Sequence, residues 1–95
     1  MLEFSWDKRK ESANLKKHKV SFVEAKSVFF DDNGRLIPDD SHSTEEDRFI
    51  LLGLSSKSKI LTVVHCYRGE VDMIRIISAR KATKAESKNY WEYLK

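Results

Sequence analysis

Cationic, imidazole and hydroxyl side chains gather at two places in this sequence. The stretch "RIISARKATKAE", residues 75–86, places Arg75, Ser78 and Arg80 among apolar neighbours. The segment "LKKH" ends in His18 after two lysines. Charged residues among apolar neighbours are usually paired with a group of opposite charge. We therefore expect an anion near this strand.

These residue types suit metal-free cleavage of RNA, in which a 2′-hydroxyl attacks the adjacent phosphate and leaves a 2′,3′-cyclic phosphate. The reaction requires removal of one proton, supply of another, and stabilisation of extra negative charge on phosphorus. Histidine titrates near neutral pH and suits the proton transfers. The planar guanidinium of arginine binds phosphate bidentately and stays charged.

Each of these residues also has a structural interpretation. Alternation along a strand puts Ser78 and Arg80 on one face, next to a helix N-terminus that favours anions, but Arg80 could instead pair with an acidic segment. His18 could simply be a cation at a helix C-terminus. A regular strand turns Arg75 to the opposite face, towards a structural or partner-binding role, unless a bulge intervenes.

Other candidate groups have weaker support from the sequence. His65 lies in the middle of a strand and is expected to be satisfied there, and the lone Cys66 is expected in the core. His42 lies in an acidic loop and is expected to be solvated. Trp6 and Phe22 could stack on a base, although packing is the simpler role.

Composition bounds the class of protein. The chain has 95 residues, of which 40% are hydrophobic, and is expected to form one domain, residues 1–95. No apolar run approaches the roughly 20 residues that span a membrane, and the N-terminus lacks a signal-peptide core. One cysteine predicts neither a disulfide nor a metal site. We therefore expect a cytoplasmic protein without cofactor or metal.

Charge is unevenly distributed along the chain. Residues 31–47 hold one Lys/Arg against seven Asp/Glu, whereas residues 48–95 hold ten against four. Basic segments on both sides of an acidic connector suggest a polyanionic partner such as nucleic acid. A mixed-charge surface that is simply solvated remains the alternative.

Capping and periodicity signals predict the elements. Helices are expected over 8–18 after Asp7, with Ala13 and Leu15 as a thin apolar face, and over 21–30 and 84–94 after capping boxes. The second should bury Phe22, Ala25, Val28 and Phe29, and the third Ala85, Tyr90, Trp91 and Leu94. Strands are expected over 47–55, 59–68 and 71–80, joined by hairpins. Residues 2–6 and 35–37 could add short strands, the latter after a type I′ turn at Asn33-Gly34.

The expected fold is thus α+β, with an antiparallel sheet of three to four strands, an N-terminal helix pair and a C-terminal helix. Two blocks, "FSWDKRKESANLKKHKVSFVEAKSVFFDD" and "VVHCYRGEVDMIRIISARKATKAES", together with "DRFILLGLS" between them, resemble the BrnT family of bacterial toxins. The resemblance covers about residues 4–90.

The resemblance implies a RelE-like ribonuclease of a type II toxin–antitoxin system that cuts RNA and inhibits translation. It implies a BrnA-type ribbon-helix-helix antitoxin that neutralises the toxin and, with it, binds promoter DNA. By motif, His18, Ser78 and Arg80 are the expected catalytic residues. Lys16, Lys17, Arg68 and Lys81 are expected to bind RNA. Many members have glycine after the histidine, where this chain has Lys19.

Two other functions remain open on the sequence. A non-catalytic module could hold RNA or a ribosome without cutting it. An inactive homologue could act only as a co-repressor subunit with its antitoxin. Only an enzyme leaves new 5′-hydroxyl RNA ends, and only an inactive subunit is harmless when expressed alone.

Overall fold

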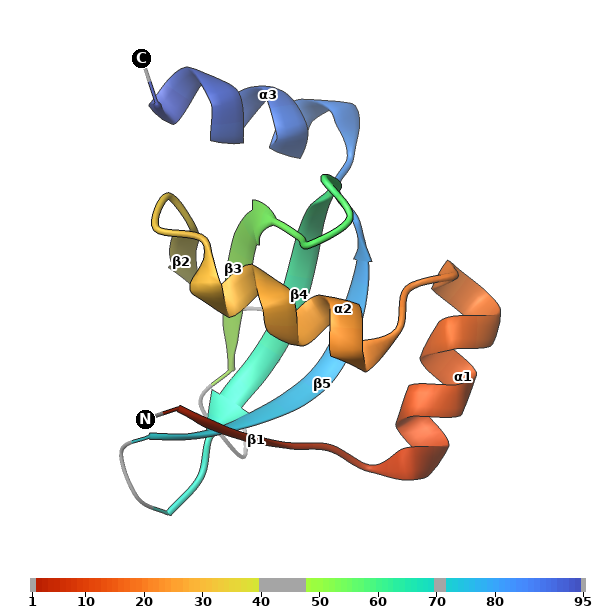
Figure 1. The fold of residues 1–95 in the computed structure, drawn as a ribbon. Helices are drawn as coiled ribbons and strands as arrows, with labels where there is room; N and C mark the ends of the chain where they lie inside the picture. The colour runs from red at the N-terminus through yellow and green to blue at the C-terminus, as the bar shows by residue number, and fades with distance from the viewer. Residues whose placement is uncertain (1, 40–47, 70–71, 95) are drawn as a thin grey trace.

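The protein is described by a computed structural model that places residues 2–39, 48–69 and 72–94. Its α+β class is as expected (Figure 1). The elements, in chain order, are β1 (Glu3–Ser5), α1 (Lys8–His18), α2 (Phe22–Ser27), the 3₁₀ helix η1 (Val28–Phe30), β2 (Arg35–Pro38), β3 (Phe49–Leu54), β4 (Ile60–Tyr67), β5 (Met73–Lys81) and α3 (Lys84–Tyr93).

The sheet differs from the expected one in size and direction. It has five strands in the order β1-β5-β4-β3-β2. The pairs from β2 to β5 are antiparallel, but β1 runs parallel to β5, with Glu3 opposite Met73. The expectation of three to four antiparallel strands was therefore wrong. Hairpins can be predicted from the residues of their turns. Pairing between β1 and β5, which are far apart in the sequence, cannot be predicted from local residues.

The main core lies between one face of the sheet and the helices α2 and η1, which cross in front of it (Figure 1). Phe22, Ala25 and Val28 are fully buried, as expected, and Phe29 is partly buried. From the sheet, the core cluster takes Leu51, Leu61, Val63, Ile76 and Ala79. Helix periodicity and strand alternation thus each present a single apolar face to this core.

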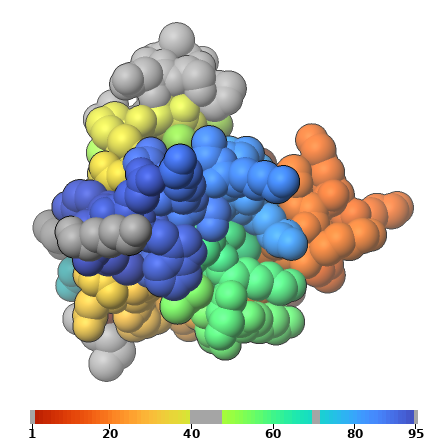
Figure 2. Space-filling view, turned by 90° about the horizontal axis from the view of Figure 1, so that it is seen from above, coloured from red at the N-terminus to blue at the C-terminus, as the bar shows by residue number. Residues whose placement is uncertain are grey.

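Helix α3 lies across one end of the sheet (Figures 1 and 2). Only Tyr90 among its described residues is buried, whereas Ala85, Trp91 and Leu94 are exposed, so the expected apolar stripe was wrong. A helix that crosses the end of a sheet brings little of its length into contact. Burial, and then the hydrogen bond to Asp31, raises the pKa of Tyr90 to about 12.

Two local expectations also failed. The positive φ values in the described residues are at Lys19, Ser58 and Gly69, so Asn33-Gly34 does not form a type I′ turn. Instead the Asp31 carboxylate accepts the N–H of Asn33, and the Asp31 carbonyl accepts that of Gly34. The first expected capping box, at Ser21 and Glu24, is only half formed. Ser21 caps α2, but the Glu24 carboxylate accepts a hydrogen bond from the Ser55 hydroxyl.

Candidate functional site: a basic groove between α1 and β5

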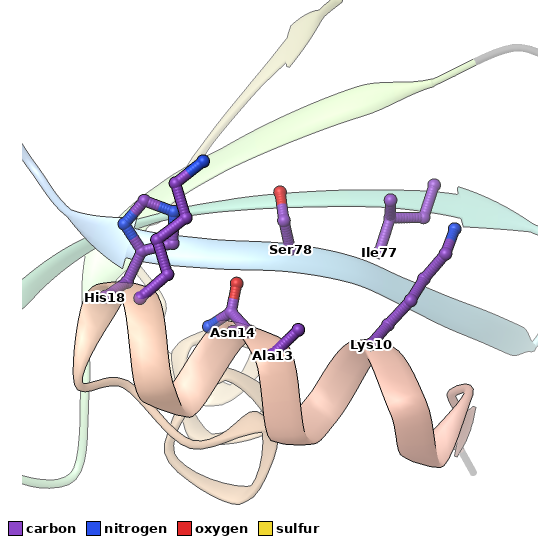
Figure 3. Close-up of a pocket in the computed structure, with 7 residues that line it drawn as sticks. Lys10, Ala13, Asn14, His18, Ile77 and Ser78 are labelled. Atoms are coloured by element: carbon purple, nitrogen blue, oxygen red, sulfur yellow. The ribbon is translucent and has the colours of Figure 1, made fainter.

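An open groove of about 210 Å³ lies between α1 and β5 (Figure 3). It brings His18 and Ser78, from distant parts of the sequence, to one site together with Lys17. No carboxylate lines it, and none of its charged side chains has an ion pair with another described residue. The lining residues are Lys10, Ala13, Asn14, Lys17, His18, Ile77 and Ser78.

Helix α1 begins and ends where its capping residues dictate. The Asp7 carboxylate accepts the backbone N–H groups of Arg9 and Lys10 at 2.7 and 3.3 Å. The helix stops at His18 because Lys19 adopts the left-handed conformation, with φ 61° and ψ 27°, while its N–H still bonds to the Leu15 carbonyl. His18 therefore stands at the helix C-terminus, where the dipole favours cations.

Asn14 fixes α1 to the sheet. Its Oδ1 accepts the Ala79 N–H at 3.0 Å, and its Nδ2 donates to the carbonyls of Ala79 and Val20, both at 2.9 Å. Strand β1 covers only Met73 to Arg75 of this edge of β5, so the amide acts as a partner for the next part of the strand. The expected apolar face of Ala13 and Leu15 was wrong: both are exposed, and Asn14 is the buried residue of the helix.

A β-bulge sets the direction of the polar side chains of β5. Val64 pairs with Ser78, but His65 pairs with Ile76, so Ile77 is an extra residue on β5. Cross-strand partners share a face. Because Thr62, Val64 and Cys66 alternate regularly on β4, their partners Arg80, Ser78 and Arg75 all lie on the face opposite the main core, which we call the second face. The expectation that Arg75 points away from Ser78 and Arg80 was wrong, for the reason that a bulge intervenes.

Arg80 is close to the groove but is already paired. Its Nη1 and Nη2 donate to the two carboxylate oxygens of Glu86 at 2.8 and 3.0 Å. Hydrogen bonding from Arg80 is the first cause that lowers the pKa of Glu86 to about 2. The same carboxylate accepts the Thr83 N–H and the Thr62 hydroxyl, completing the expected capping box of α3. Arg80 pairs with this cap, and its side chain remains 41% exposed.

The four residues expected to bind RNA are spread over the molecule. Lys17 lines the groove, while Lys16 and Lys81 are exposed at the ends of α1 and β5. Arg68 follows β4, six residues beyond the partner of Arg80, which is roughly 20 Å along a strand. Of these four residues, Lys17 is therefore the one that lines the groove.

The remaining candidates are packed inside the protein. His65 is fully buried with its ring centroid 4.8 Å from that of Phe29, and burial lowers its pKa. Its Nδ1 is 3.3 Å from the Val63 carbonyl, but its Nε2 has no hydrogen-bond partner among the described residues. We expected both ring nitrogens to be hydrogen-bonded, and among the described residues one of them is. Cys66 is buried as expected. His42 and the rest of residues 40–47 of the acidic connector lie outside the described residues.

Both aromatic candidates for base stacking take part in packing the core. Trp6 packs edge-to-face on buried Phe22, with centroids 5.9 Å apart. In residues 2–39, 48–69 and 72–94, no three His, Cys, Asp or Glu residues cluster in a way that could hold a metal ion. Over the same ranges, every helix is too short or too polar to cross a membrane.

Comparisons with known proteins place this arrangement in a family. A crystal structure of the Brucella abortus ribonuclease toxin BrnT matches 88% of this chain and all of its own, with a TM-score of 0.67 and 22% identity, which establishes a shared fold. A search of curated proteins found no match. The family model described as "Ribonuclease toxin, BrnT, of type II toxin-antitoxin system" matches residues 6–86, which include every residue of the groove. The chain therefore belongs to the BrnT family of type II toxin–antitoxin ribonuclease toxins.

Proposed function

We propose that this protein is a metal-independent, RelE-like endoribonuclease that cuts RNA and thereby inhibits translation. Family membership supplies the class of activity. The observation that carries the proposal for this chain is the groove in which His18, Ser78 and two lysines meet without a carboxylate. Such a site attracts phosphate and holds an imidazole, which can both donate and accept a proton.

The groove residues divide the work of cleavage. His18 transfers protons between the reacting oxygens and solvent. Lys10 and Lys17 stabilise the negative charge that develops on the phosphate. The Ser78 hydroxyl makes no hydrogen bond to another described residue, and so it is available to bond a phosphate or ribose oxygen.

In this proposal Arg80 orients the phosphate through hydrogen bonds and adds little net positive charge to the site. Glu86 neutralises most of its charge and takes two of the five N–H donors of the guanidinium, and Nη1 also donates to the Lys81 carbonyl at 3.3 Å. Arg80 lies on the second face beside Ser78. In this proposal the carboxylate holds the guanidinium in one orientation, from which its other donors reach the scissile phosphate.

Partners follow from the family and from the basic surface. Lys16, Lys81 and Arg68 extend RNA binding beyond the groove. A BrnA-type ribbon-helix-helix antitoxin neutralises the toxin in the cytoplasm, and promoter DNA is bound only by their complex. Of the four residues expected to bind RNA, Lys17 supports the proposal most directly, through its position in the groove.

The test is RNA cleavage by the purified chain in EDTA, without ribosomes. Wild type is expected to leave 2′,3′-cyclic phosphate and 5′-hydroxyl ends, and His18→Ala and Ser78→Ala to leave the RNA largely intact. Lys57→Ala, an exposed charge in the turn between β3 and β4, serves as the control and should cut normally. If free RNA is not cut, the assay is repeated on translating ribosomes.

Three results would contradict the proposal. Binding of RNA without new 5′-hydroxyl ends in either assay would identify a non-catalytic module. Harmless expression without an antitoxin would identify an inactive co-repressor. Cleavage that EDTA abolishes and Mg²⁺ restores would contradict metal independence.

A further inference from the structure

Arg75 occupies a position on the second face that its place in the sequence does not suggest. The bulge at Ile77 turns it to the same side of β5 as Ser78 and Arg80. Its neighbour on β4 is Cys66 and its neighbour on β1 is Ser5. Neither neighbour carries a carboxylate that could neutralise a guanidinium.

Arg75 is a partly exposed residue that has no partner among the described residues. The residue is of intermediate exposure. Within the part of the chain that the structure describes, its side chain has no ion pair or hydrogen bond. Partial burial removes water from a cation, and that cost is usually offset by a nearby anion. No anion among the described residues lies beside Arg75 to offset such a cost.

The two arginines of β5 therefore differ in what they offer a ligand. The Arg80 guanidinium is already neutralised by Glu86, whereas Arg75 keeps its full charge. On β4 the partners of Arg75 and Ser78 are two residues apart, which corresponds to about 6–7 Å along the strand. A long, flexible arginine side chain can cover that distance towards the groove.

We propose that Arg75 binds a phosphate of the RNA strand next to the one held at His18 and Ser78. This inference rests on the proposed function and extends its site from the groove onto the second face. Arg75 holds the substrate strand and takes no part in proton transfer. It thus sets how the strand crosses the sheet and which bond reaches the groove.

The test measures binding of an uncleavable 2′-O-methyl oligonucleotide over a range of salt concentrations. Arg75→Met keeps the apolar stem and removes the charge, Arg75→Lys keeps the charge, and Lys57→Ala removes an exposed charge from another part of the surface as a matched control. Loss of one phosphate contact should weaken binding about tenfold and reduce the salt slope by about 0.7–1. We expect that change for Arg75→Met, a slope like that of wild type for Arg75→Lys, and no change for Lys57→Ala.

The outcomes separate this inference from the proposed function. If wild type and Arg75→Met bind with equal affinity and slope, the inference is wrong and the proposed function stands. If wild type neither binds nor cuts RNA, both are wrong. If Arg75→Met fails to fold in a thermal unfolding experiment, the guanidinium serves the fold and the inference is overturned.

Discussion

Two regions along β5 use similar residues in opposite ways. At its C-terminal end, the Glu86 carboxylate accepts hydrogen bonds from Arg80 and from Thr62 of β4, and the same carboxylate caps α3. Beside its bulge, the charged side chains of the groove have no ion pair with any described residue. Both regions lie at the junction of a helix with the same strand. The first uses its charges to hold the fold, whereas the second leaves them available.

This difference shows why residue type alone does not identify a site. Arg80 and His18 are equally good candidates in the sequence, but only His18 lies in the groove, and Arg80 reaches a ligand only with Glu86 attached. A charge that is paired within the fold is held by its partner, while an unpaired one near a concavity is available to a ligand. The comparison predicts that mutations in the groove affect activity, and those at the cap affect stability.

The largest expected effect is at His18. General acid–base catalysis contributes about 10²–10⁴-fold, so His18→Ala should reduce the single-turnover rate of RNA cleavage by at least about 10²-fold. His18→Gln should be as inactive, because glutamine can hydrogen-bond but cannot titrate. Thermal unfolding of both variants should stay close to wild type. An active His18→Gln enzyme would show that the imidazole only binds RNA.

Asn14 should have the largest effect on stability. Replacement by alanine removes three hydrogen bonds and leaves the Ala79 N–H and C=O without partners. Leaving buried polar groups unpaired costs about 1–3 kcal/mol each, and we expect a total loss of about 3 kcal/mol in the free energy of unfolding. The measurement is urea denaturation.

Asn89→Ala provides the control for Asn14. Asn89 is an exposed asparagine on helix α3, and its replacement should change stability by no more than about 0.5 kcal/mol. An Asn14→Ala protein as stable as this control would show that water replaces the amide. It would also mean that this amide does not determine the position of α1.

What the sequence revealed of this site depended on distance along the chain. The start of α1 was predicted because Asp7 bonds to N–H groups two and three residues away. The role of Asn14 was missed because its partner Ala79 is 65 residues away. The bulge at Ile77 could be named from the sequence only as an alternative to a regular strand, since it arises from pairing between β4 and β5 and changes no residue type.

Capping boxes illustrate the same limit. Thr83 and Glu86 form the predicted box, yet nothing local indicated that Glu86 would also bind Arg80 and Thr62. Ser21 and Glu24 have the same spacing, but Glu24 bonds to Ser55 on another segment. Spacing in sequence thus identifies possible partners, and the packing of distant segments chooses among them.

At the C-terminal end of β5, Glu86→Gln tests whether the pair serves stability. Loss of the ion pair should cost about 1 kcal/mol, because both side chains are partly exposed. The pKa of Glu86 is lowered from 4.5 to about 2 in the folded protein. The carboxylate therefore stabilises the fold above pH 4.5, and this stabilisation is lost as pH falls through about 2. Urea unfolding across that range should show the difference from wild type shrinking.

Glu92→Gln is the matched control on the same helix. Glu92 makes an exposed contact of 3.9 Å with Lys88, so its replacement should change stability by less than about 0.5 kcal/mol at any pH. If Glu86→Gln behaves like Glu92→Gln, the contrast between the two regions of β5 fails, and Arg80 is as available to a ligand as Arg75.

The smallest expected effect is a gain in stability at the end of α1. Lys19 has φ 61°, where a Cβ is unfavourable and glycine is not. Lys19→Gly should therefore raise the free energy of unfolding by about 0.5–1 kcal/mol, less any loss from the more flexible unfolded chain. Lys16→Gly, within the same helix, should lower it by a similar amount. Because the turn after His18 keeps its conformation, Lys19→Gly should cut RNA at the rate of wild type. A slower Lys19→Gly enzyme would mean that the Lys19 side chain itself contributes to the groove.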